Sequence, residues 1–219
     1  KNGYYMMPVP HEIVRKSKKY RELAERWIEA LESGQDPETD AALTAAQGIV
    51  NAASVALNQW VFQQTGSWLD KQKKVALLGG DHSTPYGFIK ALSERYRDFA
   101  VLQIDAHADL RQAYEGFIHS HASIMYNVIT DLPNVSLVQF GIRDYCDEEL
   151  AFMQAHPQRI RTFFDRDIKR GLYEGKTWKT VCEELIAALP QRVYISFDID
   201  GLDPKLCPNT GTPVPGGFE

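Results

Sequence analysis

The sequence predicts an α/β fold in three layers, a parallel sheet with helices on both of its faces. From residue 75 onward, short apolar stretches rich in Val, Ile and Phe alternate with longer segments of helical periodicity. This rhythm is typical of parallel strands joined by crossover helices. Polar clusters follow three of these stretches, as ligand-binding groups do at the carboxyl ends of parallel strands. With 219 residues, 44% of them hydrophobic, the chain can bury one sizeable core.

The first third of the chain is predicted to be helical. Apolar residues recur at helical spacing among many charges in 11–32, and Ser33-Gly34 ends that run. A second helix is expected over 38–70, because Asp36-Pro37 precedes it and few helix breakers lie inside it. Its three large aromatic residues are interpreted as packing residues: Trp60, Phe62 and Trp68.

The remaining two thirds are predicted to alternate between strands and helices. Each predicted strand is a short apolar run bounded by polar or glycine residues, and each predicted helix is a longer run with helical spacing. We expect strands near 75–79, 99–105, 135–141, 160–164 and 192–199. We expect helices around 84–97, 121–130, 147–156 and 177–189.

Composition excludes several classes of protein. A net charge of −5 and a pI near 5.7 leave no basic surface for nucleic acid, whereas an acidic pocket would suit a cationic partner. No apolar run is long enough to cross a bilayer, and the first residues lack a signal-peptide pattern. Cys146, Cys182 and Cys207 are odd in number and widely spaced, so we expect reduced thiols and a cytoplasmic protein.

Three polar clusters carry the chemistry: Gly79-Gly80-Asp81-His82-Ser83, Asp105-Ala-His107-Ala-Asp109 and Asp198-Ile-Asp200. In an extended chain alternate side chains share one face, so the Asp and His residues of the second cluster can converge, as can those of the third. A single Asp at a strand end is more often a helix cap or turn former. Several carboxylates and imidazoles side by side, however, would repel one another unless a cation lay among them. The clusters together therefore predict a site for two divalent ions.

The order and the amino-acid sequences of these clusters resemble the motifs of the ureohydrolase family, which includes arginase, agmatinase and related guanidine-cleaving enzymes. The resemblance covers roughly residues 72–219, and its motifs are specific in combination. The matching runs are Gly-Gly-Asp-His-Ser at 79–83, Ile-Asp-Ala-His-Ala-Asp at 104–109, Ser-Phe-Asp-Ile-Asp-Gly-Leu-Asp-Pro at 196–204 and Gly-Thr-Pro at 211–213.

The resemblance implies an arginase-like fold and a defined set of ligands for each ion. One ion would take His82, Asp105, Asp109 and Asp198, and the other Asp105, His107, Asp198 and Asp200. Ligands dominated by carboxylate oxygen, with two imidazoles and no thiolate, favour two manganese ions over structural zinc. Nickel and cobalt remain alternatives, because imidazole suits both metals.

The resemblance also implies a reaction. Two ions about 3.5–4 Å apart can lower the pKa of a shared water enough to supply hydroxide near neutral pH. That nucleophile, in a site in which Asp105 bridges both ions, would attack a guanidinium carbon to give urea and an amine. His121, in Ser-His-Ala-Ser, stands where the agmatinase branch carries its proton-shuttling histidine, a role that suits an imidazole. His119 is interpreted as an exposed or supporting residue.

The loop between the second cluster and His121 indicates the substrate. Arginases carry an asparagine two residues after the last metal Asp, and Arg111 stands there in this chain, as in agmatinases. Glu115 could face a cationic amine, although an exposed loop carboxylate is more often merely solvated. Thr212 matches a polar residue close to substrate in the family, with a turn hydroxyl as the alternative. Arg143, in Gly-Ile-Arg-Asp, is expected to pair with an acidic neighbour and is given no chemistry.

Agmatine hydrolysis to putrescine and urea is the leading interpretation, and hydrolysis of guanidine with nickel or of arginine is the alternative. Formiminoglutamase-like members share Asp-Leu-Arg but usually lack the histidine found here at 121. Asp198-Ile-Asp-Gly also resembles the start of haloacid-dehalogenase phosphatases, but the Leu202-Asp203-Pro204 that follows departs from that pattern. A non-catalytic metal-binding or scaffold protein is the rival from a different class.

The expected organisation is a helical segment, residues 1–71, packed on the central part of a ureohydrolase-like domain, residues 72–219. The chain begins with Lys1 rather than Met and ends at Glu219, before the strand from which the family supplies a carboxylate that grips the guanidinium. We therefore expect a piece of a longer protein. By the same resemblance, the full-length protein is expected to form trimers or hexamers.

Overall fold

The computed structural model describes residues 3–219 and divides the chain into two compact units. The first unit runs to Ala56 and includes the short segment Glu115–Phe117, and the second holds Leu57–Tyr114 and Ile118–Glu219. The division falls inside one long helix rather than at the predicted boundary near residue 71, which stays a prediction. Within residues 3–219, no helix combines the length and the apolarity that a membrane span requires.

The first unit is built from helix α1 (His11–Glu32), a short 3-10 turn η1 (Pro37–Thr39) and the first half of helix α2 (Ala41–Asp70). Helix α1 ends as predicted, because Gly34 adopts a left-handed φ of 76° and the chain turns back on the last carbonyls of the helix. The Asp40 carboxylate accepts hydrogen bonds from Ala42 N and Leu43 N and so caps α2. The second helix therefore begins at Ala41 rather than at 38.

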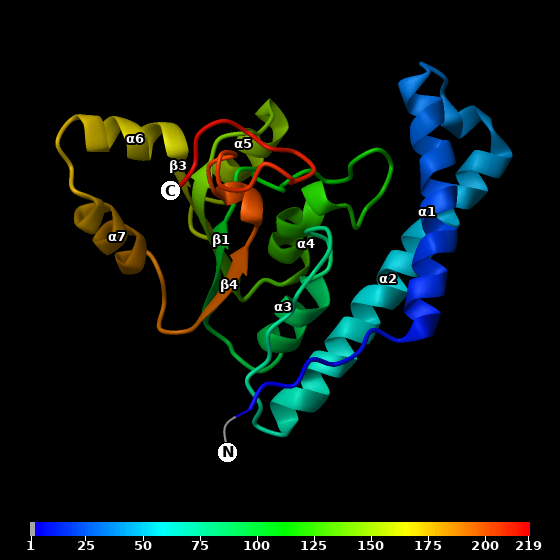
Figure 1. Cartoon of the computed structure of the whole chain (residues 1–219), viewed down its shortest axis with the longest axis horizontal. Helices are drawn as coiled ribbons and strands as arrows, with labels where there is room; N and C mark the ends of the chain where they lie inside the picture. Colours follow the sequence, from blue (N-terminus) through cyan, green and yellow to red (C-terminus); the bar gives the residue numbers. More distant parts are fainter. Residues whose placement is uncertain (1–2) are drawn as a thin grey trace. The chain divides into compact units, whose positions relative to one another are not determined.

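A four-stranded parallel sheet forms the centre of the second unit. Its strands are β1 (Phe99–Ile104), β2 (Val135–Ile142), β3 (Ile160–Phe164) and β4 (Val193–Phe197), in the order β3-β2-β1-β4. All three pairings are parallel, so the carboxyl ends of the four strands lie at one edge of the sheet. The segment after β4, coloured orange to red, gathers at that edge (Figure 1).

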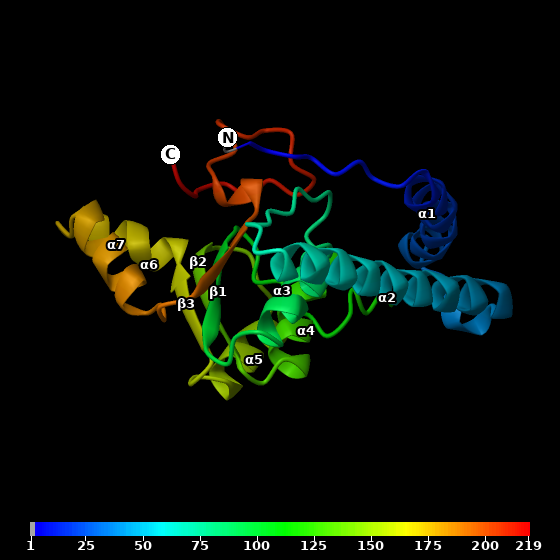
Figure 2. The same cartoon turned by 90° about the horizontal axis from the view of Figure 1, so that it is seen from below.

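Helices cover both faces of this sheet, as the sequence predicts (Figure 2). Successive residues of a buried strand point to opposite faces, so Val101 and Leu137 enter one core while Leu102 and Val138 enter the other. The first core is completed by α3 (Tyr86–Ser93), α4 (Ile124–Asp131) and α5 (Asp147–Ala155). The second is completed by α6 (Asp165–Tyr173) and α7 (Trp178–Ala187).

Two details differ from the sequence prediction. The run 75–79, predicted as a strand, forms no strand in the described structure, and its Leu78 is 85% exposed. The sheet ends at β3 and β4, and this run pairs with neither of these edge strands. Helix α6, by contrast, was not predicted; it is short and highly charged, and it buries only Asp165 and Ile168.

Candidate metal centre

The end of β1 supplies three of the six predicted ligands. Asp105 follows the last residue of the strand and is 1% exposed. The chain then leaves extended geometry, because Asp105 Oδ1 accepts a hydrogen bond from His107 N at 2.7 Å and Asp109 adopts a left-handed φ of 55°. The three side chains therefore converge through a tight polar turn, and the alternation of a regular strand predicted for this cluster was wrong in detail.

The end of β4 brings Asp198 and Asp200 to the same place. Asp198 N donates to Ile104 O at 2.9 Å, which continues the pairing of β4 with β1 by one residue. A 3-10 turn η3 (Ile199–Gly201) follows, and within it Asp200 Oδ1 accepts a hydrogen bond from Ala106 N at 3.1 Å. A Cβ on Gly201 would lie 3.0 Å from Asp105 N, so glycine is what allows these two strand ends to approach.

His82 reaches the cluster from the loop that precedes α3. Its Nδ1 lies 2.9 Å from Asp105 Oδ2 and 2.7 Å from Asp109 Oδ2, and its Nε2 lies 2.8 Å from Ser196 Oγ. Although these contacts are short, the buried Nδ1 has no hydrogen bond of acceptable direction. Two ligand atoms at right angles on one ion, each about 2.1 Å from it, lie about 3 Å apart. The spacing around His82 Nδ1 therefore fits donor atoms that share a cation.

Two groups of side chains could each hold an ion, and they share one carboxylate. The first group is His82, Asp105 and Asp109, and the second is Asp105, His107 and Asp200, in which His107 Nδ1 lies 3.1 Å from Asp200 Oδ2. Asp198 is more open, 27% exposed, with Oδ2 at 3.5 Å from His82 Nδ1. The structure thus brings all six predicted ligands together, while sharing of Asp198 between two ions stays a prediction.

The electrostatics of the cluster favour positive charge. Burial lowers the pKa of His107, but its contacts with Asp105 and Asp200 outweigh burial and raise that pKa to about 10. His82 shows the same balance, with a pKa raised above its ordinary value. Burial and the neighbouring charge of Asp105 raise the pKa of Asp109 to about 7. The negative charge of the carboxylates therefore favours bound protons, and a divalent cation in the cluster would be stabilised by the same negative charge.

The chemistry of the donor set agrees with this fit. Four carboxylates and two imidazoles, with no thiolate, are ligands for a manganese, nickel or cobalt ion rather than for a structural zinc site. The second imidazole, His107, also has Asp144 Oδ2 at 3.6 Å from its Nε2, which is a common outer partner of a ligating histidine. The residues present therefore fit a binuclear centre.

The cluster forms the floor of a cavity of about 440 Å³. The wall above it comes from two further segments, the loop around Gly80 and the segment Asn209–Thr212, together with His121 and Ile199. No Lys or Arg side chain is among the residues that line this cavity in the described part of the chain. The remaining lining residue is a carboxylate, Asp81, which hydrogen-bonds to Ser83 in the same loop.

The two neighbouring histidines have different surroundings. His121 lies in the 3-10 turn η2 (His121–Ser123), lines the cavity and packs edge-on against the Tyr114 ring at 5.6 Å. His119 does not line the cavity; it is half-buried, 5.5 Å from the Tyr86 ring, and burial lowers its pKa. The interpretation of His119 as an exposed or supporting residue stays a prediction.

Of the three residues predicted to contact substrate, one lines the cavity and two do not. Thr212 lines the cavity wall. Arg111 does not line it; its guanidinium lies over the Tyr114 ring at 5.2 Å, with Nε 3.8 Å from Glu149 Oε2. Glu115 belongs to the first unit and adopts a left-handed φ of 51°. Contacts of all three residues with substrate stay predictions.

Arg143 has a positioning role that the sequence prediction missed. It was expected to pair with an acidic neighbour, but its guanidinium donates to backbone carbonyls, including Asp200 O at 2.6 Å and Val214 O at 3.0 Å. It thereby joins the end of β2 to the turn that carries one ligand and to the segment after the cavity wall. Such contacts depend on the folded backbone, so no local motif reveals them.

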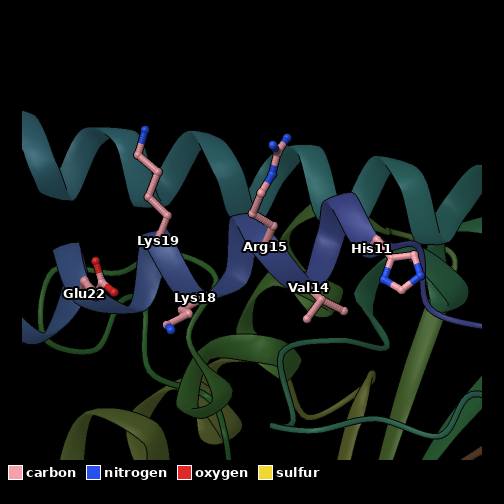
Figure 3. Close-up of a pocket in the computed structure, with 6 residues that line it drawn as sticks. All are labelled: His11, Val14, Arg15, Lys18, Lys19 and Glu22. Carbon is pink, nitrogen blue, oxygen red and sulfur yellow. The ribbon is translucent and has the colours of Figure 1, made fainter.

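A second concavity lies on α1 and has no comparable chemistry. Its side chains all come from that one helix, and Figure 3 shows that they point in different directions and do not converge on a common point. They are His11, Val14, Arg15, Lys18, Lys19 and Glu22.

Replacing Ser196 by Ala is expected to weaken metal binding about 10- to 100-fold, because the Ser196 hydroxyl orients His82 through Nε2. Titration of the metal-free protein with Mn²⁺ would measure the change. Ser136→Ala is a matched control, since Ser136 lies near the amino end of β2, away from the ligands. Equal affinities for wild type and Ser196→Ala would show that this hydrogen bond does not support the centre.

Comparison with known proteins shows similarity to one enzyme family, both in a family model and in individual relatives. The family model described as "Arginase family" matches residues 9–219. N(1)-aminopropylagmatine ureohydrolase of Thermus thermophilus is 35% identical over 225 residues, covering 98% of this chain and 73% of that protein. Agmatinase of Halalkalibacterium halodurans is 34% identical over 159 residues, covering 70% of this chain and 50% of that protein.

Solved structures show the same similarity. The crystal structure of agmatine ureohydrolase of Thermoplasma volcanium superposes with a TM-score of 0.63 at 28% identity. The match covers 75% of this chain and 53% of that one. This chain therefore spans about half the length of that solved protein and of the Halalkalibacterium relative.

Proposed function

Because this chain belongs to the arginase family, we propose that it hydrolyses the guanidino group of an agmatine-type substrate, releasing urea and an amine. The family match and the named relatives confirm the resemblance to ureohydrolases. They also confirm the prediction of a hydrolase that acts on amidino compounds. The observation that carries the proposal is the pair of ligand groups that share Asp105 at the floor of the cavity.

The side chains of the centre would form two ligand sets, one for each ion. His82 and Asp109 would hold one ion with Asp105, and His107 and Asp200 would hold the other with the same carboxylate. Two divalent ions, when bound, lower the pKa of water and so supply a nucleophile near neutral pH. Manganese is the proposed metal, and nickel is the alternative, because the oxygen-rich set favours a hard ion while the two imidazoles also suit nickel.

His121 would complete the reaction from the cavity wall. Addition of water oxygen to the guanidinium carbon and cleavage of one C–N bond leave urea and an amine that must gain a proton. An imidazole gains and loses protons near neutral pH, and His121 is the histidine outside the two ligand groups that lines the cavity. We therefore assign it the transfer of that proton to the leaving nitrogen.

The wall of the cavity supports a substrate without a carboxylate. A charged donor binds the carboxylate of a guanidino acid such as arginine most strongly, and no Lys or Arg lines the described cavity, where Asn209, Thr210 and Thr212 offer only neutral donors. Asp81 instead adds negative charge beside the centre. A cationic tail, as in agmatine or N(1)-aminopropylagmatine, suits this field better.

Urea release tests the proposal. The metal-free protein, loaded with Mn²⁺ or with Ni²⁺, would be assayed with agmatine, N(1)-aminopropylagmatine, arginine and guanidine. We expect the highest kcat/KM with one of the two amine substrates and at least about 10-fold less with arginine, a difference of about 1.4 kcal/mol. Preference for arginine or guanidine would contradict the proposed substrate class. Absence of urea from every combination would favour a non-catalytic metal-binding protein.

A further inference from the structure

A row of polar side chains crosses the sheet near the ends of its strands. On β1 and β4 it lies two residues before the first metal ligand. Gln103 on β1 is in register with Gln139 on β2, Gln139 with Thr162 on β3, and Gln103 with Ser196 on β4. We call these four residues the polar row. Both glutamines are completely buried, and Ser196 is 4% exposed. Polar side chains in the interior of an otherwise apolar sheet are costly unless every group is satisfied, so their presence calls for a reason.

Hydrogen bonds run through three members of the row in one direction. Thr162 Oγ1 donates to Gln139 Oε1 at 2.8 Å, and Gln139 Nε2 donates to Gln103 Oε1 at 2.7 Å. Gln103 Nε2 then donates to Asp105 Oδ2 at 2.9 Å and to Asp109 Oδ2 at 3.4 Å. The last acceptors in this chain are carboxylates of the metal centre.

Backbone carbonyls fix that direction. Gln139 Nε2 also donates to Ala108 O at 2.8 Å, and Gln103 Nε2 to His107 O at 3.1 Å. A carbonyl can only accept, so each amide must present its nitrogen to the carbonyl and its oxygen to the preceding member of the row. The Gln103 amide is therefore held with its donors toward the carboxylates, which leaves their other lone pairs available for a cation.

Asp105 and Asp109 belong to the ligand group that also contains His82, and the other end of the row, Ser196, contacts that histidine. Ser196 Oγ contacts His82 Nε2 at 2.8 Å. The row thus contacts the ligating side chains of His82, Asp105 and Asp109, which form one of the two ligand groups. In the second group, side chains of the row contact the shared Asp105 carboxylate and the backbone carbonyl of His107, which is not a ligand atom.

We propose that the polar row is a positioning device for one ion of the pair, the ion held by His82, Asp105 and Asp109. Thr162 and Gln139 orient the Gln103 amide, and Gln103 and Ser196 orient the three ligands. This inference rests on the proposed binuclear centre. It assigns a positioning role to four residues that belong to neither ligand group.

Thr162 offers the sharpest test, because it touches no ligand. Thr162→Val keeps the shape of the side chain and removes the hydroxyl, whereas Thr162→Ser keeps the hydroxyl and is the matched control. Gln103→Met removes the amide that contacts the carboxylates. The metal-free proteins would be titrated with Mn²⁺ alone, with calorimetry for affinity and stoichiometry and electron paramagnetic resonance to distinguish single ions from coupled pairs.

We expect wild type and Thr162→Ser to bind two ions. Thr162→Val should weaken one ion about 10-fold and Gln103→Met about 100-fold, with the other ion changed much less, in the range known for outer partners of metal ligands. At limiting Mn²⁺ these variants should show single ions in place of coupled pairs. A network that only stabilised the sheet would lower the unfolding temperature without this difference between the ions.

The possible failures can be told apart. If wild type binds two ions and Thr162→Val binds both as wild type does, or weakens both equally, the positioning role is wrong. If wild type binds no ion after reconstitution, the binuclear centre itself is wrong. Should Gln103→Met fail to fold, as judged by circular dichroism, the comparison of Thr162→Val with Thr162→Ser still decides the question.

Discussion

Replacement of Asp105 by Asn is expected to remove both ions and to lower urea release by more than about 10³-fold, because the reaction then loses its activated water. Asp105 is the carboxylate that both ligand groups share, with Oδ2 2.9 Å from His82 Nδ1 and Oδ1 3.6 Å from His107 Nδ1. An amide cannot offer two anionic oxygens. Even an outer partner of a ligand is worth about 10- to 100-fold in metal affinity, so a shared ligand must be worth more.

Elemental analysis after reconstitution with Mn²⁺, together with the urea assay, would measure this effect. Asp98→Asn is the matched control, because Asp98 precedes the same strand at its opposite end and is exposed. The control should retain two ions per chain. If Asp105→Asn also retained two ions and full turnover, the assignment of the centre would be wrong.

His121→Asn is expected to retain both ions while turnover falls by about 10²- to 10⁴-fold, the range that general acid–base catalysis contributes. His121 lines the cavity but belongs to neither ligand group, so its loss should separate catalysis from metal binding. Asn keeps a polar side chain of similar size but cannot take up and release a proton near neutral pH. Metal content and kcat, measured on the same preparation, would test both halves of the prediction.

His119→Asn provides the comparison for that experiment. His119 contacts Asn127 and the Tyr86 ring rather than the cavity, so its replacement should lower turnover much less than that of His121. A larger loss in His119→Asn than in His121→Asn would exchange the two roles. Equal rates for wild type and His121→Asn would remove His121 from the reaction.

Much of the fold and of the centre could be predicted because the relevant information is local. Hydrophobic runs such as 135–141 and 160–164 identify strands by themselves, and a ligand that follows such a run must lie at the carboxyl edge of a parallel sheet. For that reason the five ligands that follow β1 and β4 lie together, whereas His82 joins them from a loop that follows no strand. The run 75–79 has the same local pattern but forms no strand, because a strand also needs pairing with a neighbouring strand, which no local pattern reveals.

The polar row escaped prediction for a related reason. Gln103 is the lone polar residue of its apolar strand, and Gln139 lies between apolar residues in its own strand, so both are visible in the sequence as a signal of a buried polar site. Their alignment with Thr162 and Ser196, however, depends on the register between strands. Register follows from packing of the whole sheet, and sequence spacing within one strand does not determine it. The same holds for Arg143 and its distant carbonyl partners.

The separation of the ligands along the chain has a thermodynamic consequence. His82 meets the end of β4 across 114 residues of sequence, so cations shared by these segments would act as a reversible cross-link that closes a long loop. Such a cross-link adds about 2.7 kcal/mol to the free energy of unfolding when free ion reaches about 100 times its dissociation constant. Resistance to heat and to proteolysis would then vary with the supply of trace metal, and a chelator would act on this protein as a mild denaturant.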